Sequence, residues 1–169
     1  VRRGIWRRGL EMHQLPIKEG ENHIHGGSGI DTEVWDFQPS CDDKAACVDL
    51  TLLDPNGHND YPGDLKIHVR YELDNDNTLH YSMNAVSDKL TIFNPVNHTY
   101  FTLGEPETIK DLQMQMNADY YLPVDKTGLP DQGMTEVAGT AFDFRKMKRV
   151  GDALESSDPQ IKNRDGMDH

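Results

Sequence analysis

The alternation of apolar and polar residues over positions 65–73 constrains the fold of this chain most strongly. In Leu65-Lys66-Ile67-His68-Val69-Arg70-Tyr71-Glu72-Leu73 every second side chain is apolar or aromatic. Successive side chains of a strand point to opposite faces of a sheet, so this pattern is typical of a half-buried antiparallel strand. The turn sequence Asp74-Asn75-Asp76-Asn77 follows, and residues 78–86 return with the same alternation. The two segments are therefore predicted to form a hairpin.

Shorter alternating stretches separated by turn sequences continue along the chain. Val48-Asp49-Leu50-Thr51-Leu52 predicts a strand, and so does Ala141-Phe142-Asp143-Phe144-Arg145. Met114 and Met116 have strand spacing and are expected in the core. No stretch shows convincing helical periodicity. At 169 residues, the chain is expected to be one domain (residues 1–169) with an all-β, antiparallel sandwich-like fold.

Charge and composition exclude several kinds of partner. The net charge of -12 makes nucleic acid and anionic membranes poor partners, and no apolar run is long enough for a membrane span. The basic cluster Arg2, Arg3, Arg7 and Arg8 is the exception, but nothing elsewhere supports a nucleic-acid site.

The two cysteines, Cys41 and Cys47, indicate the compartment. They could close a short loop at most, and their C-x5-C spacing matches no zinc pattern. A reducing compartment fits this usage better than a disulfide scaffold does. We therefore expect a cytoplasmic protein.

A histidine in Asn94-Pro95-Val96-Asn97-His98-Thr99-Tyr100-Phe101-Thr102-Leu103 is the first candidate for chemistry. An imidazole with an ordinary pKa near 6.5 can give and take a proton near neutral pH. The neighbouring amide and phenol offer hydrogen bonds, and Phe101 and Leu103 offer an apolar wall. This combination suits a positioned proton donor. An ordinary structural histidine at the end of a strand is the alternative.

A glycine-rich stretch, Asn22-His23-Ile24-His25-Gly26-Gly27-Ser28-Gly29, is the second candidate. We expect the end of a strand that runs into a flexible loop, where glycines let the backbone approach a ligand closely. The loop lacks the spacing of a phosphate-binding P-loop. On a strand His23 and His25 would share one face, as metal ligands can, but no third ligand has suitable spacing. Hydrogen bonding to a polar ligand and simple surface positions remain the alternatives.

Six stretches of the sequence are informative as a set. They are Asn22-His23-Ile24-His25-Gly26-Gly27, Tyr61-Pro62-Gly63, Asn97-His98-Thr99-Tyr100-Phe101, Ala118-Asp119-Tyr120-Tyr121-Leu122-Pro123-Val124-Asp125, Val137-Ala138-Gly139-Thr140-Ala141-Phe142-Asp143-Phe144-Arg145 and Gly166-Met167-Asp168-His169. Together they resemble the aldose 1-epimerase (galactose mutarotase) family, and they occur in the family's order. The resemblance covers essentially the whole chain, whereas the chain covers only about the middle half of the family.

The resemblance implies an incomplete galactose-mutarotase-like β-sandwich that acts on a small-molecule sugar. Members of the family interconvert the α and β anomers of free aldoses such as galactose and glucose, as isomerases without cofactor or metal. A general acid protonates the ring oxygen while a general base removes the proton of the C1 hydroxyl. We expect a monomer or a homodimer.

The resemblance also assigns residues to roles. His98 matches the general acid, and His25 matches the histidine that hydrogen-bonds the sugar near the ring oxygen. Asp168 matches an aspartate that holds sugar hydroxyls. The remaining substrate-binding candidates are Asn22, which opens the His25 motif, and the two residues that follow the acid, Thr99 and Tyr100.

Two departures from the family bear on activity. The family's general-base glutamate would lie beyond His169, and its sugar-binding arginine would fall just before Val1. We therefore expect these 169 residues alone to be inactive or poorly soluble, as part of a longer enzyme. The alternatives for the base within this chain are Glu19, Glu21 and Glu105. The alternatives for the function are a catalytically inactive carbohydrate-binding module and an epimerase for sugar phosphates.

Overall fold

The computed structural model describes residues 1–101, 103–104, 107–164 and 166–167. The chain divides into two compact units, Val1–Val96 and Asn97–His169, and each is described by itself. In both units the strands pair antiparallel, so the predicted all-β class is confirmed. The assignment of residues 1–169 to a single domain stays a prediction. None of the helices among the described residues is long and apolar enough to cross a membrane.

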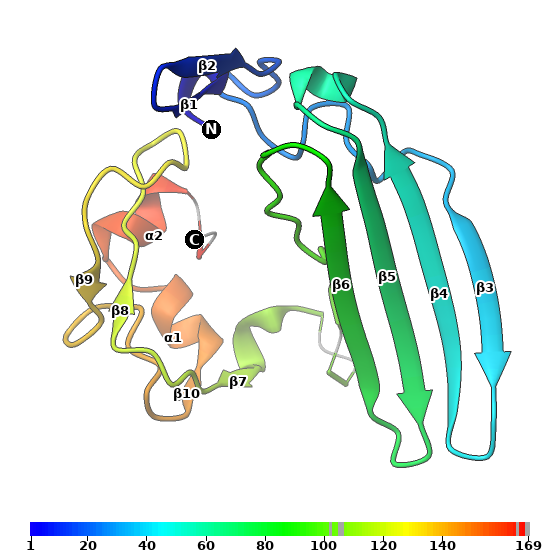
Figure 1. The fold of residues 1–169 in the computed structure, drawn as a ribbon. Helices are drawn as coiled ribbons and strands as arrows, with labels where there is room; N and C mark the ends of the chain where they lie inside the picture. Colours follow the sequence, from blue (N-terminus) through cyan, green and yellow to red (C-terminus); the bar gives the residue numbers. More distant parts are fainter. Residues whose placement is uncertain (102, 105–106, 165, 168–169) are drawn as a thin grey trace. The chain divides into compact units, whose positions relative to one another are not determined.

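The first unit consists of a short hairpin and a four-stranded sheet (Figure 1). In the hairpin the rings of Trp6 and His13 lie opposite each other and stack with centroids 4.6 Å apart. The strands of this unit are β1 (Ile5–Arg8), β2 (Glu11–Gln14), β3 (Asp36–Cys41), β4 (Ala45–Asp54), β5 (Leu65–Asp74) and β6 (Leu79–Ser87). Two 3-10 turns, Arg2–Gly4 and His58–Asp60, complete it.

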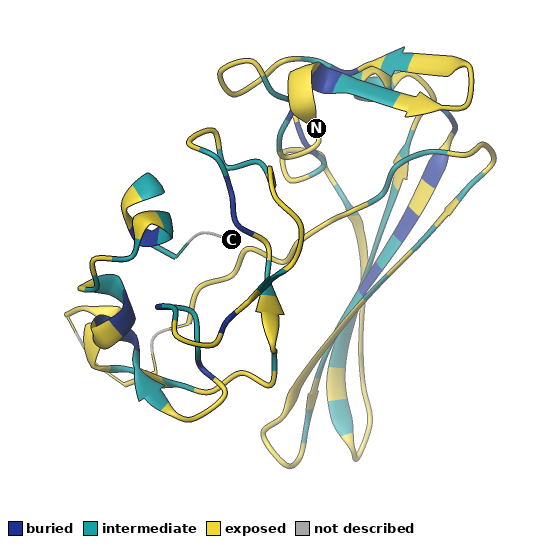
Figure 2. Cartoon of the chain, turned by 90° about the vertical axis from the view of Figure 1, so that its left-hand side faces the viewer, coloured by how far each residue is buried: buried dark blue, intermediate teal, exposed yellow. Residues whose placement is uncertain are grey.

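The sheet has the order β3-β4-β5-β6, so strands that follow each other in the chain are neighbours (Figure 1). The predicted hairpin of β5 and β6 is confirmed, and its register places Tyr71 opposite Tyr81. One face of β5 buries Leu65, Ile67 and Val69, and exposed or half-buried residues alternate with them (Figure 2). The alternation in the sequence is therefore the alternation of burial in the sheet. The partly buried side chains packed on this cluster include Ile30, Trp35, Leu50, Leu52, Met83, Ala85 and Phe93.

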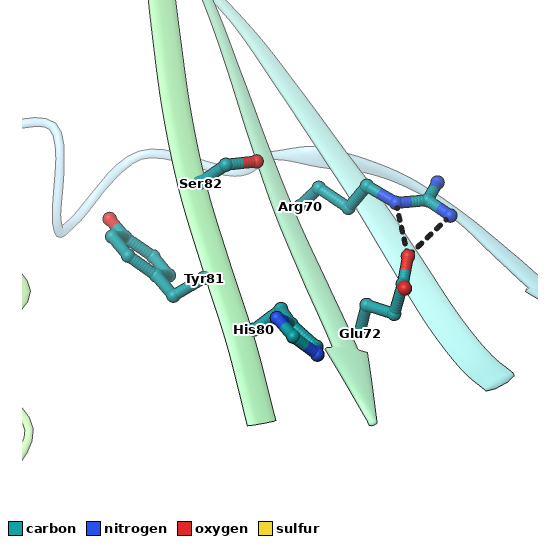
Figure 3. A pocket seen from close by; sticks show the side chains of 5 residues that line it. All are labelled: Arg70, Glu72, His80, Tyr81 and Ser82. Atoms are coloured by element: carbon teal, nitrogen blue, oxygen red, sulfur yellow. Dashed lines mark hydrogen bonds and ion pairs between the residues drawn. The ribbon is translucent and has the colours of Figure 1, made fainter. Parts of the chain in front are cut away.

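The opposite face of the sheet carries a network of charged side chains. Arg70 on β5 donates from Nη1 to Asp49 Oδ2 on β4 at 2.7 Å, and from Nη2 to Glu72 Oε2 at 3.0 Å (Figure 3). His68 lies 2.7 Å from the other oxygen of Asp49. Asp49 thus pairs across the strands with Arg70 and His68, whereas Arg70 and Glu72 pair along β5, and together they satisfy the polar groups of the half-exposed face.

The two cysteines lie on neighbouring strands but on opposite faces. Cys41 is opposite Ala46 and Cys47 is opposite Ser40, so the two residues are one step out of register. Both are free thiols. The alternation of side chains along a strand explains why so short a loop is not closed by a disulfide.

The second unit is built from short elements around a small core. Its strand pairs are β7 with β10 and β8 with β9. The core cluster consists of Ala141, Phe144, Ala153 and Ile161. The elements are a 3-10 turn (Ile109–Asp111), β7 (Gln113–Met114), β8 (Tyr120–Tyr121), β9 (Thr135–Glu136), β10 (Lys148–Arg149), α1 (Val150–Leu154) and α2 (Pro159–Asn163).

Three expectations about the second unit are wrong. Residues 141–145 form a turn instead of a strand, because Thr140 Oγ1 accepts from the Phe142 N–H at 3.1 Å. Met116 is 50% exposed, whereas Met114 packs on the core as expected. Two short helices are present where no helix was predicted, and α2 begins at an aspartate N-cap followed by proline, which is a recognised start signal.

Candidate functional site

The loop that carries Asn22 and His25 is irregular. Asn22 forms an isolated bridge with Glu19, and its side-chain oxygen accepts from the Arg3 N–H at 3.1 Å. In the structure Asn22 thus joins two turns of the first unit. A role for it in sugar binding stays a prediction.

The expectation that His23 and His25 share a strand face is wrong. His25 has a φ angle of 52°, and Gly26 and Gly27 follow with φ angles of 67° and 80°. These left-handed residues interrupt any extended strand. His23 is only 3% exposed, whereas the side chain of His25 lies on the surface of the first unit. The two histidines therefore have different environments.

His23 is hydrogen-bonded at both ring nitrogens. Nδ1 lies 2.7 Å from the carbonyl oxygen of Pro16, and Nε2 lies 2.6 Å from the hydroxyl of Tyr61. A carbonyl oxygen only accepts, so Nδ1 carries the proton. In the tautomer whose proton is on Nδ1, Nε2 accepts from the Tyr61 O–H. Since both nitrogens have protein partners, the sequence hypothesis of His23 as a metal ligand is not supported.

A second set of contacts holds the other end of the loop. Asn59 Oδ1 accepts from the Ser28 N–H at 2.8 Å, and Asn59 Nδ2 lies 3.1 Å from His58 Nε2. His58 Nδ1 is in turn hydrogen-bonded to Asp54 Oδ1. Nothing in the sequence pattern signalled this network, because Ser28 lies 31 residues from Asn59 in the chain.

His98, the predicted general acid, lies in the second unit. Residues 90–101 contain no strand or helix, so the alternative of an ordinary histidine at the end of a strand is wrong. Asn97 Oδ1 accepts from the Thr99 N–H at 3.1 Å and from its hydroxyl at 2.6 Å. This local turn fixes the backbone around His98. The rings of His98 and Tyr100 lie 5.2 Å apart, centroid to centroid, at 56°.

The predicted site residues are thus distributed over both units. Asn22 and His25 belong to Val1–Val96, whereas His98, Thr99 and Tyr100 belong to Asn97–His169. Asp168, and Glu105 as a substitute base, lie outside the described residues. The assignment of His98 and His25 to the same sugar oxygen stays a prediction.

Two shallow depressions lie elsewhere. One is lined by residues of β5 and β6, where Arg70 is held by Glu72 (Figure 3). The other, in the second unit, is lined by Asp119, Tyr120, Glu136, Ala138 and Arg145. Neither includes a predicted site residue. Within the described parts of the chain no three His, Cys, Asp or Glu side chains are grouped as metal ligands.

Comparison with known proteins decides the family. The model of the aldose 1-epimerase family matches residues 10–169. The chain belongs to the aldose 1-epimerase family. The resemblance seen in the six sequence stretches is therefore confirmed.

Individual members of the aldose 1-epimerase family match over most of the chain. It is 35% identical over 162 residues to an aldose 1-epimerase of Haemophilus influenzae, with 94% of this chain and 46% of that protein covered. It is 39% identical over 152 residues to a galactose mutarotase of Rattus norvegicus, with 88% and 42% covered. The chain thus spans about half the length of the curated relatives it matches.

A solved structure in the same family supports the fold. The crystal structure of a galactose 1-epimerase from Lactobacillus acidophilus matches with a TM-score of 0.96 and 70% sequence identity. The match covers 100% of this chain and 50% of the Lactobacillus acidophilus chain. The galactose-mutarotase-like β fold expected from the sequence is confirmed.

Proposed function

We propose that this chain is part of an aldose 1-epimerase that interconverts the α and β anomers of free hexoses such as galactose and glucose. The observation that carries the proposal is 70% identity, over the whole chain, to a protein named galactose 1-epimerase. The family match over residues 10–169 includes both histidine motifs and supports the same conclusion.

The proposed reaction needs two proton transfers. The His98 imidazolium gives its proton to the ring oxygen, while a general base takes the proton of the C1 hydroxyl. The bond between C1 and the ring oxygen breaks, and a C1 carbonyl forms. Rotation about C1–C2 and reversal of both transfers close the ring with the opposite configuration. The atoms balance without a cofactor.

His25 is proposed to hydrogen-bond the sugar near the same oxygen, and Asp168 to hold sugar hydroxyls. Asn22, Thr99 and Tyr100 complete the proposed binding residues. The general base is proposed to lie in the half of the family's length that this chain does not span. A cytoplasmic location is part of the proposal, and the two free thiols support it.

Polarimetry of the full-length protein that contains this chain tests the proposal. Freshly dissolved α-D-galactose or α-D-glucose should reach its equilibrium rotation much faster than in buffer alone. A protein that binds these sugars but leaves the rate at its buffer value would be a carbohydrate-binding module instead, and the proposal would be wrong.

A further inference from the structure

The buried imidazole of His23 joins its own segment to Pro16, seven residues away, and to Tyr61, 38 residues away. It contacts the Pro16 carbonyl on one side and the Tyr61 hydroxyl on the other, at 2.7 and 2.6 Å. The backbone of His23 is fixed as well, because its N–H donates to the Val1 carbonyl at 3.0 Å. His23 is 3% exposed, and burial of its polar ring without these partners would cost free energy of folding. The position of His23 is therefore held by both its backbone and its ring.

Tyr61 is a firm anchor for this ring. Its carbonyl accepts from the Gly57 N–H at 2.8 Å, and its own N–H donates to the His58 carbonyl at 3.1 Å. Burial, followed by the negative charge of Asp54, raises the pKa of Tyr61. The phenol thus keeps its proton at neutral pH and remains a donor to His23 Nε2.

His25 depends on such an anchor. It follows His23 by two residues, has a φ angle of 52°, and precedes two left-handed glycines. Non-glycine residues in this region of backbone space persist only where the surroundings hold them. Glycines alone would leave the loop free to take many conformations. The Gly27 N–H donates to the Ile24 carbonyl at 3.2 Å, and the contacts of His23 on one side and of Ser28 with Asn59 on the other add to this constraint.

We propose that His23 is a positioning residue for His25, acting through its hydrogen bonds to Pro16 and Tyr61. This inference rests on the proposed function, because His25 needs a fixed direction only if it binds the sugar. His23 itself, enclosed by protein groups, does not touch the substrate.

A double-mutant cycle on the full-length protein separates positioning from simple stabilisation. Tyr61→Phe removes one hydroxyl and keeps the ring. We expect it to lower kcat/KM for α-D-galactose about tenfold in the wild-type background, and less than twofold in a His25→Ala background. Tyr81→Phe, the same change on β6, should be neutral in both. Equal losses in both backgrounds, or no loss in either, would overturn the inference.

Two further measurements cover the other outcomes. If Tyr61→Phe does not fold, the cycle is run with His23→Asn, which keeps a donor for Pro16 and should retain more activity than His23→Ala. If the wild type does not accelerate mutarotation, the proposed function fails. The effect of His23 on the loop is then measured by NMR of the backbone amides instead. Tyr61→Phe should then shift the His25 and Gly27 amide signals, whereas Tyr81→Phe should not; unshifted signals would contradict the role of His23.

Discussion

Gly27 lies against the side chain of Asn59 so closely that a Cβ atom on the glycine would be 2.7 Å from Asn59 Cγ. Asn59 cannot move away freely, because its Oδ1 accepts from the Ser28 N–H at 2.8 Å. The backbone at Gly27 is also left-handed, with a φ angle of 80°. Close approach and backbone conformation together require glycine at this position of the loop.

Gly27→Ala should therefore destabilise the full-length protein more than Gly9→Ala. Gly9 has a φ angle of 56° and nothing within 4 Å of an added Cβ, so it isolates the backbone cost. We expect that cost to be roughly 1–2 kcal/mol at either site. Overlap with Asn59 should add roughly 1–3 kcal/mol at Gly27. Urea denaturation measures the free energy of unfolding of both variants. Equal losses of stability in the two variants would show that the Asn59 side chain moves aside without cost.

Asp158→Ala should destabilise the second unit. Asp158 Oδ1 caps α2 by accepting from the Gln160 N–H at 2.9 Å, and Oδ2 accepts from the Ala141 N–H at 3.1 Å. Loss of the cap costs about 1 kcal/mol, and the unpaired Ala141 N–H adds roughly 1 kcal/mol. Asp152→Ala, an exposed acid in the first turn of α1, is the control and should change stability by less than about 0.5 kcal/mol. Thermal unfolding that ranks the two variants equally would contradict the assignment.

Arg145→Gln should raise the pKa of Asp143. The Arg145 guanidinium hydrogen-bonds this carboxylate and holds its pKa at about 2 in the folded protein, below the ordinary 3.8. Because the folded-state pKa is the lower one, Asp143 stabilises the fold above pH 3.8, and this contribution is lost as the pH falls towards 2.

Carboxyl-carbon NMR titration of the full-length protein measures the change directly. In Arg145→Gln the Asp143 midpoint should move towards 3.8. Asp42, whose pKa is lowered mainly by the Lys44 and Ala45 N–H groups, serves as an internal control and should not move. An Asp143 midpoint that stays near 2 would show that another group holds the carboxylate.

The sequence predicted the parts of the fold that depend on period-two burial. The alternation in β5 is strict because Leu65, Ile67 and Val69 fill the core on one face of the strand, whereas the residues between them lie on the other face. The short strand expected at 141–145 failed for a local reason, because Thr140 hydrogen-bonds the backbone and forms a turn. Ala141 and Phe144, three residues apart, are both buried, whereas a strand would place them on opposite faces. Alternation alone does not reveal such competition from a side chain.

The sequence was enough to indicate the family, but not the local structure around His25. The motif containing His25 indicated the correct family, but the sequence pattern placed His23 and His25 together on one face of a strand. The difference arises from left-handed backbone at His25 and from contacts of His23 with Pro16, seven residues away, and with Tyr61, 38 residues away. Periodicity carries no information about contacts of this kind.

The central claim is that His98 is the general acid of an aldose 1-epimerase. The most direct test is the rate of α-D-galactose mutarotation, followed by polarimetry with full-length wild type, His98→Ala and His80→Ala. His80 is an exposed histidine on β6 that pairs with Asp74, so its loss should leave the rate unchanged. The account predicts that His98→Ala lowers kcat about 10²- to 10⁴-fold while the variant still binds galactose. A His98→Ala protein with the full wild-type rate would contradict it.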